Sequence, residues 1–155
     1  MANAFVGTGK RLSAEELDKV EGRIGLTLPS SLREHYLKHN GGRPKKSYFV
    51  DGDHELDVHH FNKMLDERSE LGGVFEKMYE VVVQKKKLIP LHLIPFAINQ
   101  GGDFFCMDKE TEEIFFYEMD YCLEPERAAR KLAPSLAYFL EHMVTEDDLH
   151  DLDDE

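Results

Sequence analysis

The stretch Leu93–Asp108, LIPFAINQGGDFFCMD, decides the fold. It consists of two short apolar runs separated by Asn99-Gln-Gly-Gly102, and these four residues are typical of a tight turn. Two apolar runs joined by so few residues predict an antiparallel hairpin, with strands over 93–98 and 103–108. Pro95 lacks a backbone donor, which places it at a sheet edge or at a bulge.

A third strand and a closing helix follow this hairpin. The polar segment Lys109–Glu113 is a second turn, and Ile114–Met119 continues the apolar pattern. Three strands joined by short turns predict an antiparallel meander. Pro134 then opens a helix. The expected buried side of that helix consists of Leu136, Phe139, Leu140 and Met143.

Upstream of the hairpin, the sequence predicts one helix and two strands. Apolar residues at helical spacing favour a helix from about Gly73 to Lys86, although the β-branched run Val81–Val83 lowers its helix propensity. The segment Ser47–Val50 has the pattern of a strand, and a second short strand is expected around residues 56–60.

Two short helices are expected near the N-terminus. Ser13-Ala-Glu-Glu16 has the pattern of a capping box, and Gly25 ends the helix that follows it. Pro29 opens the second helix, in which Ser31-Leu-Arg-Glu34 offers another capping box. Asn40-Gly41-Gly42 supplies the left-handed backbone that stops this helix.

Length and composition predict one soluble domain. The 155 residues are 41% hydrophobic, which suffices for one core, and neither an internal repeat nor a linker is evident. The order of helices, sheet and helix predicts a single α+β domain with a central, largely antiparallel sheet and flanking helices. No apolar run approaches membrane-spanning length and the N-terminus lacks a signal-peptide pattern, so we expect a cytoplasmic protein with Cys106 and Cys122 reduced.

The net charge of −12 is unevenly distributed. The last eleven residues, TEDDLHDLDDE, hold seven acids and no Lys or Arg, which leaves 24 acids against 19 bases in residues 1–144. Because such a segment repels itself and buries little apolar surface, we expect a folded domain over 1–144 and a disordered acidic tail over 145–155. The tail serves solubility or attracts a basic partner. This charge balance opposes direct nucleic-acid binding, which requires a basic face.

Two patterns suggest a metal site, and neither is complete. His35 and His39 have the four-residue spacing at which two imidazoles on a helix share a metal, but a catalytic zinc site needs a third ligand and a nearby base. In Asp51-Gly-Asp-His-Glu-Leu-Asp57, acids occupy every second position. An EF-hand loop needs glycine at its sixth and glutamate at its twelfth position, where this sequence has Leu56 and Asn62. We therefore predict no metal and no cofactor.

Three further patterns do not indicate an enzyme. Gly7–Lys10 looks like part of a phosphate-binding loop, but it lacks both the earlier glycine and the hydroxyl residue after the lysine. Cys106 lies in an apolar strand, where burial raises the pKa of a thiol and makes it inert. His59 and His60 are adjacent in an expected strand, so their side chains should point to opposite faces.

Two segments taken together have a recognisable order. The first runs from Glu21-x-x-Ile24-Gly25 through Leu28-Pro29 to Asn40-Gly41-Gly42. The second runs from Ile94-Pro-Phe-Ala97 through Gly101-Gly102-Asp103 to Phe105-Cys-Met-Asp108. Over roughly Ser13–Met143 this arrangement resembles the SUKH superfamily, which includes the yeast cell-wall assembly regulator and many bacterial immunity proteins.

The resemblance implies an α+β fold and a non-enzymatic role. Bacterial members typically bind and neutralise a cognate protein toxin, often a basic nuclease. The resemblance also makes Pro29 and the paired glycines scaffold positions, and it supplies no catalytic residues. Two alternatives stay open: an intracellular scaffold or regulatory module of the same fold, and a metal-dependent enzyme that uses His35, His39 and the acidic stretch.

An immunity protein would need an acidic surface, because charge complementarity speeds association with a basic toxin. Alternation in a strand or hairpin would place the four acids between residues 51 and 57 on one face, and two further acids follow the last meander strand. The expected partner-binding residues are Asp51, Asp53, Glu55, Asp57, Glu118 and Asp120. Tyr48, Tyr117 and Tyr121 are either aromatic anchors of that contact or half-buried sheet residues.

Overall fold

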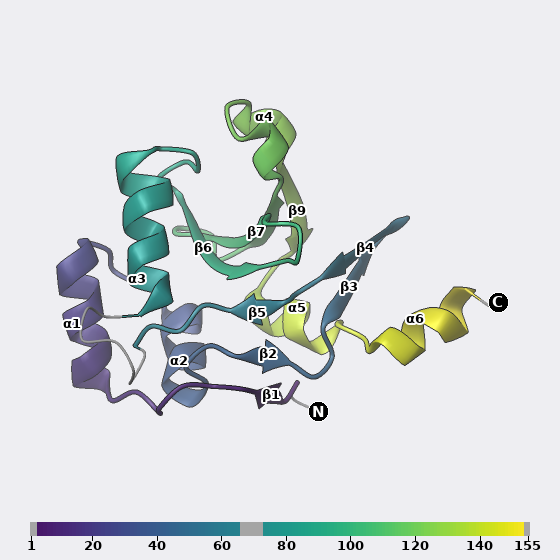
Figure 1. The fold of residues 1–155 in the computed structure, drawn as a ribbon, viewed down its shortest axis with the longest axis horizontal. Coiled ribbons are helices and arrows are strands. Elements are labelled where there is room, and N and C mark those ends of the chain that lie inside the picture. The colour runs from purple at the N-terminus through teal and green to yellow at the C-terminus, as the bar shows by residue number, and fades with distance from the viewer. Residues whose placement is uncertain (1–2, 66–72, 154–155) are drawn as a thin grey trace.

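The computed structural model describes residues 3–65 and 73–153, and Figure 1 shows how their helices and strands are arranged. The helices are α1 (Ala14–Ile24), α2 (Ser30–Lys38), α3 (Val74–Met78), α4 (Pro125–Ala128), α5 (Leu136–Glu141) and α6 (Glu146–Asp153). The strands are β1 (Phe5–Val6), β2 (Arg43–Pro44), β3 (Tyr48–Asp51), β4 (His54–Asp57), β5 (His60–Phe61), β6 (Leu93–Ile98), β7 (Phe104–Asp108), β8 (Ile114–Tyr117) and β9 (Ala129–Ala133).

The central sheet is antiparallel, with strand order β5-β6-β7-β8-β9. Strands β6, β7 and β8 pair in sequence order, which confirms the predicted meander and the single α+β fold. The pairing register shifts between Pro95 and Ala97, so the proline of β6 lies at a bulge rather than at an edge. In the turn between β6 and β7, Gly102 has a φ of +91°, a backbone conformation that favours glycine.

Several strands lie outside the sequence prediction. Strand β9 pairs with β8, and β1 pairs with β2 near the N-terminus. The segment expected to form one short strand at 56–60 is divided. Its first part completes the hairpin of β3 and β4, and its last part begins β5, which pairs with β6.

Helix α1 has the predicted caps, whereas α2 begins differently. Ser13 and Glu16 form the reciprocal capping box of α1. At α2 the predicted second capping box is wrong, because the backbone N–H and the hydroxyl of Ser31 both donate to Oε1 of Glu112, at 3.0 and 2.7 Å. A carboxylate from the β7–β8 turn thus satisfies the first turn of α2 and favours its dipole.

The motif residues between α1 and α2 have a structural role. Oε2 of Glu21 accepts a hydrogen bond of 2.7 Å from the Leu28 backbone, so it fixes the corner between the helices. Arg33 of α2 contacts the same carboxylate and lies 2.7 Å from Asp18. The two helices are therefore joined by one buried corner and one ion-pair network.

The two glycines after α2 allow neighbouring backbone segments to approach closely, and they do not stop the helix. The helix ends at Lys38, with His39 as an extended cap, before the glycines begin. At Gly42 φ is +94°, and an added Cβ would lie 2.6 Å from the carbonyl oxygen of Val6. Asn40 joins the same segments, because its side-chain amide donates to the Lys10 carbonyl and accepts from the Met64 backbone N–H.

Helices α2 and α5 share one core with the meander. Tyr36 of α2 is fully buried, and its hydroxyl donates to the carbonyls of Asn62 (2.7 Å) and Phe96 (3.3 Å). The predicted buried side of α5 is confirmed, and Phe139 packs 5.6 Å from Phe105 of β7. The helix expected from residue 73 is present as α3, and it continues as a π-helical segment over Tyr79–Lys85 that contains the valine run.

The C-terminal segment differs from the expected disordered tail. Residues Glu146–Asp153 form α6, which projects from the body of the molecule (Figure 1). Its start is a reciprocal cap between Thr145 and Asp148, with N–H···O distances of 3.0 and 3.1 Å. This cap and the acids of the first turn favour a helix. Residues 154–155 lie outside the described residues. Among the helices of 3–65 and 73–153, none is both long and apolar enough to cross a membrane.

Candidate functional site

The β3–β4 hairpin does not carry its four acids on one face, so that part of the prediction is wrong. The chain reverses at the two-residue turn Gly52–Asp53, and the reversal exchanges the faces of the residues that follow. Alternate residues of a strand share a face, so Asp51 lies on the side of buried Phe49. Glu55 and Asp57 lie on the opposite side.

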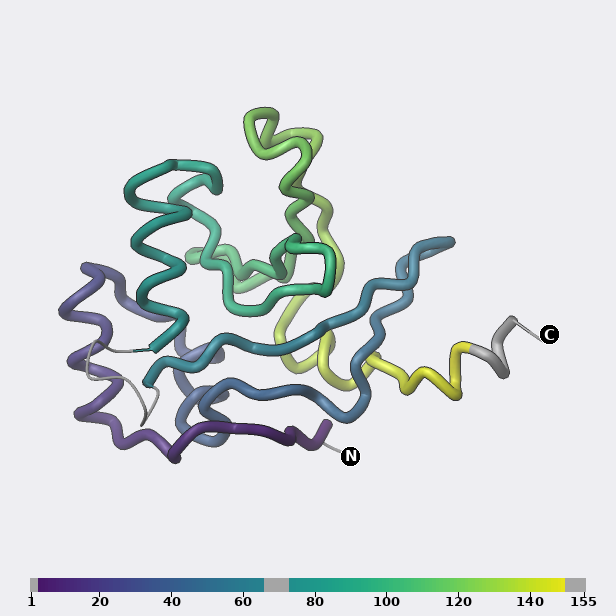
Figure 2. Tube along the Cα trace, in the orientation of Figure 1, coloured from purple at the N-terminus to yellow at the C-terminus, as the bar shows by residue number. Residues whose placement is uncertain are grey.

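Asp51 contacts the central sheet, while the hairpin tip stands free of it. Nη1 of Arg130 in β9 lies 3.5 Å from Oδ2 of Asp51, and both side chains are about one third exposed. Figure 2 shows the hairpin projecting from the body of the molecule. Asp53 and Glu55 are exposed on this projection. A basic partner could therefore approach them without displacing other elements.

The other three predicted acids meet at one end of the five-stranded sheet, around the β6–β7 turn. The backbone N–H of Gln100 donates to Oδ2 of Asp57 at 3.1 Å. On the other side of the turn, the N–H of Met119 donates to Oδ1 of Asp103 at 2.8 Å. Helix α4 and its N-cap residue add two exposed acids that the sequence did not single out, Glu126 and Glu124. The acidic end is defined here as Asp57, Glu118, Asp120, Glu124 and Glu126.

The three candidate tyrosines have different environments. Tyr117 is a core residue, because it is fully buried and its hydroxyl donates to the Cys122 carbonyl at 2.9 Å. Burial raises the pKa of Tyr117 to about 12. Tyr48 is half-buried and forms a β-bridge with Val144. Tyr121 is also half-buried and lies at the acidic end, where it is the one candidate anchor of the three.

The histidines of α2 have a core environment. His35 is buried, and its ring lies 5.0 Å from the rings of both Phe5 and Phe61. Burial, helped by His39 and Lys38, lowers the pKa of His35 to about 3, so the imidazole is neutral. In residues 3–65 and 73–153 no three His, Cys, Asp or Glu side chains converge as metal ligands.

The thiol of Cys106 is fully buried in β7. Burial raises its pKa, which suppresses the reactive thiolate. The cysteine is therefore part of the core, as its apolar sequence context predicted.

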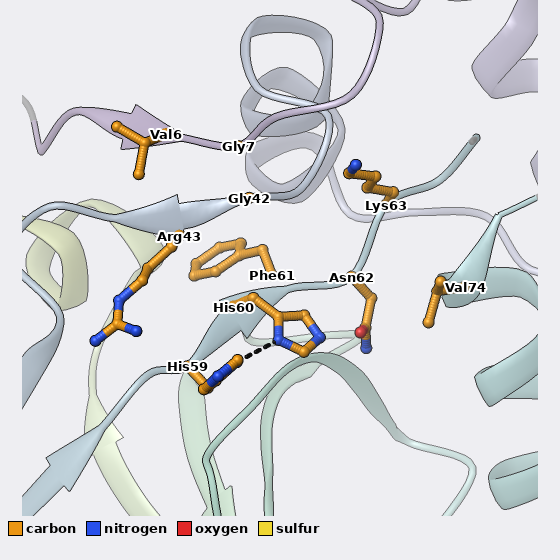
Figure 3. Close-up of a pocket in the computed structure, with 10 residues that line it drawn as sticks. All are labelled: Val6, Gly7, Gly42, Arg43, His59, His60, Phe61, Asn62, Lys63 and Val74. Atoms are coloured by element: carbon orange, nitrogen blue, oxygen red, sulfur yellow. Dashed lines mark hydrogen bonds between the residues drawn. The ribbon is translucent and has the colours of Figure 1, made fainter. Parts of the chain in front are cut away.

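A groove of about 380 Å³ lies where β1, β2 and β5 adjoin (Figure 3). His59 and His60 stand on its rim with their Nδ1 atoms 2.7 Å apart, contrary to the expectation of opposite faces. His59 precedes β5 and is not bound by strand alternation, so its ring contacts that of its neighbour. Of the described residues that line the groove, Arg43 and Lys63 are cationic and none is a carboxylate.

These features define a class: a single-domain α+β protein with a helix pair, an antiparallel meander, a closing helix and an exposed acidic end. The family follows from comparison. The family model of the SMI1 / KNR4 family (SUKH-1) matches residues 11–142, from just before α1 to just after α5. The chain belongs to this family, which confirms the resemblance found in the sequence. The comparison with curated proteins gave no match.

Proposed function

We propose that this protein is a cytoplasmic, non-enzymatic immunity protein that binds a basic protein toxin and neutralises it by covering its active surface. Membership of the SUKH family supports this role, because the superfamily includes bacterial immunity proteins. The observation that carries the proposal is the acidic end, where five exposed or half-exposed carboxylates lie at the end of β4, after β8 and in or next to α4. A basic nuclease is the kind of partner that this charge favours.

The acidic end has two properties that suit rapid binding. Its charge attracts a basic protein over a distance of about 8 Å at physiological ionic strength, which raises the association rate. Its turns are also held in place before binding, since Asp57 and Met119 both bond the β6–β7 turn region. A preformed surface loses little conformational entropy when a partner docks.

Toxin neutralisation can be tested directly. The protein encoded immediately upstream of the gene is expressed under a tight promoter, with and without this protein, and cell growth is measured. We expect growth arrest by the neighbour alone and recovery when both are present. A neighbouring gene whose product does not arrest growth would favour the scaffold alternative, if this protein also co-purifies with envelope or signalling proteins.

The role of the acidic end requires a matched pair of variants. Glu118→Lys with Asp120→Lys should lower the association rate about tenfold at low salt, measured by stopped-flow mixing with the purified toxin. Glu34→Lys with Glu110→Lys makes the same change in net charge. Both control positions are exposed and lie near the opposite end of the sheet, close to the contact of Ser31 with Glu112. Equal rates for the two double variants would remove the acidic end from the proposal.

A further inference from the structure

A projection at the acidic end presents an apolar side chain to solvent. Residues Met119–Ala128, comprising a 3₁₀ turn and helix α4, connect the end of β8 to the start of β9 and stand above the sheet (Figure 1). Leu123 lies at the middle of this segment and is 82% exposed, more than any other large apolar side chain among the described residues. Leu91 follows at 64%.

The backbone on both sides of Leu123 is fixed by hydrogen bonds. The carbonyl of Cys122 accepts from the hydroxyl of buried Tyr117 at 2.9 Å. The N–H of Glu124 donates to the carbonyl of Tyr121 at 2.8 Å. An exposed leucine on a backbone that is already ordered needs little further ordering to bind, which is the property of a preorganised anchor.

The surroundings of Leu123 indicate the chemistry of what would cover it. The guanidinium of Arg127 lies 3.9 Å from the ring centre of Tyr121, and tyrosine and arginine are enriched at binding hot spots. Arg127 is the one base of the segment 118–128. Against it stand four acids, Glu118, Asp120, Glu124 and Glu126. The net negative charge around the leucine matches a partner with basic residues around an apolar pocket.

We propose that Leu123, supported by Tyr121, is the apolar anchor of a docking surface for a basic protein. This inference rests on the proposed function and adds the contact on which affinity depends: the acids steer the partner, and the leucine enters an apolar pocket ringed by lysine or arginine. Burying a leucine side chain that water otherwise surrounds contributes enough to change the dissociation constant by one to two orders of magnitude.

Leucine-to-serine variants at two positions test the anchor. Leu123→Ser should weaken binding of the purified toxin of the neighbouring gene at least tenfold, measured as Kd by calorimetry, mainly through faster dissociation. Leu91→Ser is the matched control. Leu91 is also exposed, but it precedes β6 at the end of the sheet opposite to the acidic end. Equal Kd values for Leu123→Ser and the unmodified protein, with toxin still neutralised, would overturn the anchor and leave the proposed function standing.

A second experiment keeps the inference testable if no toxin is neutralised. A photoreactive benzophenone amino acid is placed at position 123 or 91 in the producing cells, and adducts are identified after irradiation. We expect a basic protein to be attached at position 123 and not at position 91. When that basic protein is purified, Leu123→Ser should weaken its binding at least tenfold. Adducts at 123 no stronger than those at 91, or an acidic protein at 123, would refute the inference.

Discussion

Replacing His35 should remove a large part of the acid sensitivity of the fold. His35 is 8% exposed, and its Nε2 has no hydrogen-bond partner among the described residues. Because burial lowers the pKa of the folded imidazole to about 3, the unfolded chain, with a pKa near 6.5, takes up the proton first. The stability that His35 confers is therefore complete above pH 6.5 and is lost progressively as the pH falls towards 3.

The size of this effect follows from the two pKa values. Between pH 7 and pH 5 the unfolded imidazole becomes almost fully protonated, while the folded one with a pKa of about 3 remains neutral. The linkage relation gives a loss of about 2 kcal/mol in the free energy of unfolding over this interval. That is a large share of the total stability of a small domain.

Urea unfolding at pH 7, 6 and 5 measures the loss. The wild type should lose about 2 kcal/mol more than His35→Phe or His35→Gln, neither of which titrates at this position. The glutamine variant keeps the test valid if the larger phenylalanine ring disturbs the core. His54→Gln, at the exposed hairpin tip, should behave as the wild type. Parallel pH profiles for the wild type and both His35 variants would refute the assignment of acid sensitivity to this residue.

Three further predictions concern stability. Gly42→Ala should lower the free energy of unfolding in urea by about 2–4 kcal/mol, because φ at Gly42 is +94° and the new Cβ would lie 2.6 Å from a β1 carbonyl oxygen. Gly22→Ala is the control, because Gly22 lies in open space within α1. That variant should raise the free energy of unfolding by about 0.5–1 kcal/mol. Glu112→Gln should cost about 0.5–1 kcal/mol at pH 7. The pKa of Glu112 is lowered by its hydrogen bonds to Ser31, so this difference should shrink as the pH falls from 7 through the lowered pKa of the folded carboxyl. A difference that does not change with pH would contradict the charge effect. Thr145→Ala should destabilise α6 by about 1 kcal/mol, because the N-cap hydrogen bond to the Asp148 N–H is lost. Hydrogen exchange should then be faster for the amides of α6 and unchanged for those of the core. Equal exchange rates in α6 for the variant and the wild type would contradict a stabilising cap.

The sequence predicts those elements whose partners are close in the chain. The β6–β8 meander and the Ser13 capping box depend on neighbouring segments, and both are present. Strand β9, ARKLA, has no alternating or β-branched pattern, and its conformation comes from pairing with the open edge of β8. The start of α2 depends on Glu112, 81 residues away from Ser31, which no local pattern reveals.

The candidate site was predictable in charge but not in geometry. Alternation correctly describes a single strand, and the two-residue turn at Gly52–Asp53 then places Asp51 on the other face from Glu55. Glu118 and Asp120 lie near Asp57 because the β6–β7 turn bonds both regions, a contact between distant segments. The exposure of Leu123 depends on the fold of α4, so hydrophobicity alone would have assigned it to the core.

The buried hydroxyl of Tyr36 has a consequence for the order of events during synthesis on the ribosome. Its two acceptors are the carbonyls of Asn62 and Phe96, and the second belongs to β6. A nascent chain that has emerged only as far as the β3–β4 hairpin lacks both acceptors and the β6 strand against which α2 packs. The native environment of the Tyr36 hydroxyl therefore cannot be completed until β6 has left the exit tunnel, so α2 reaches its final packing only after more than half of the chain has been made.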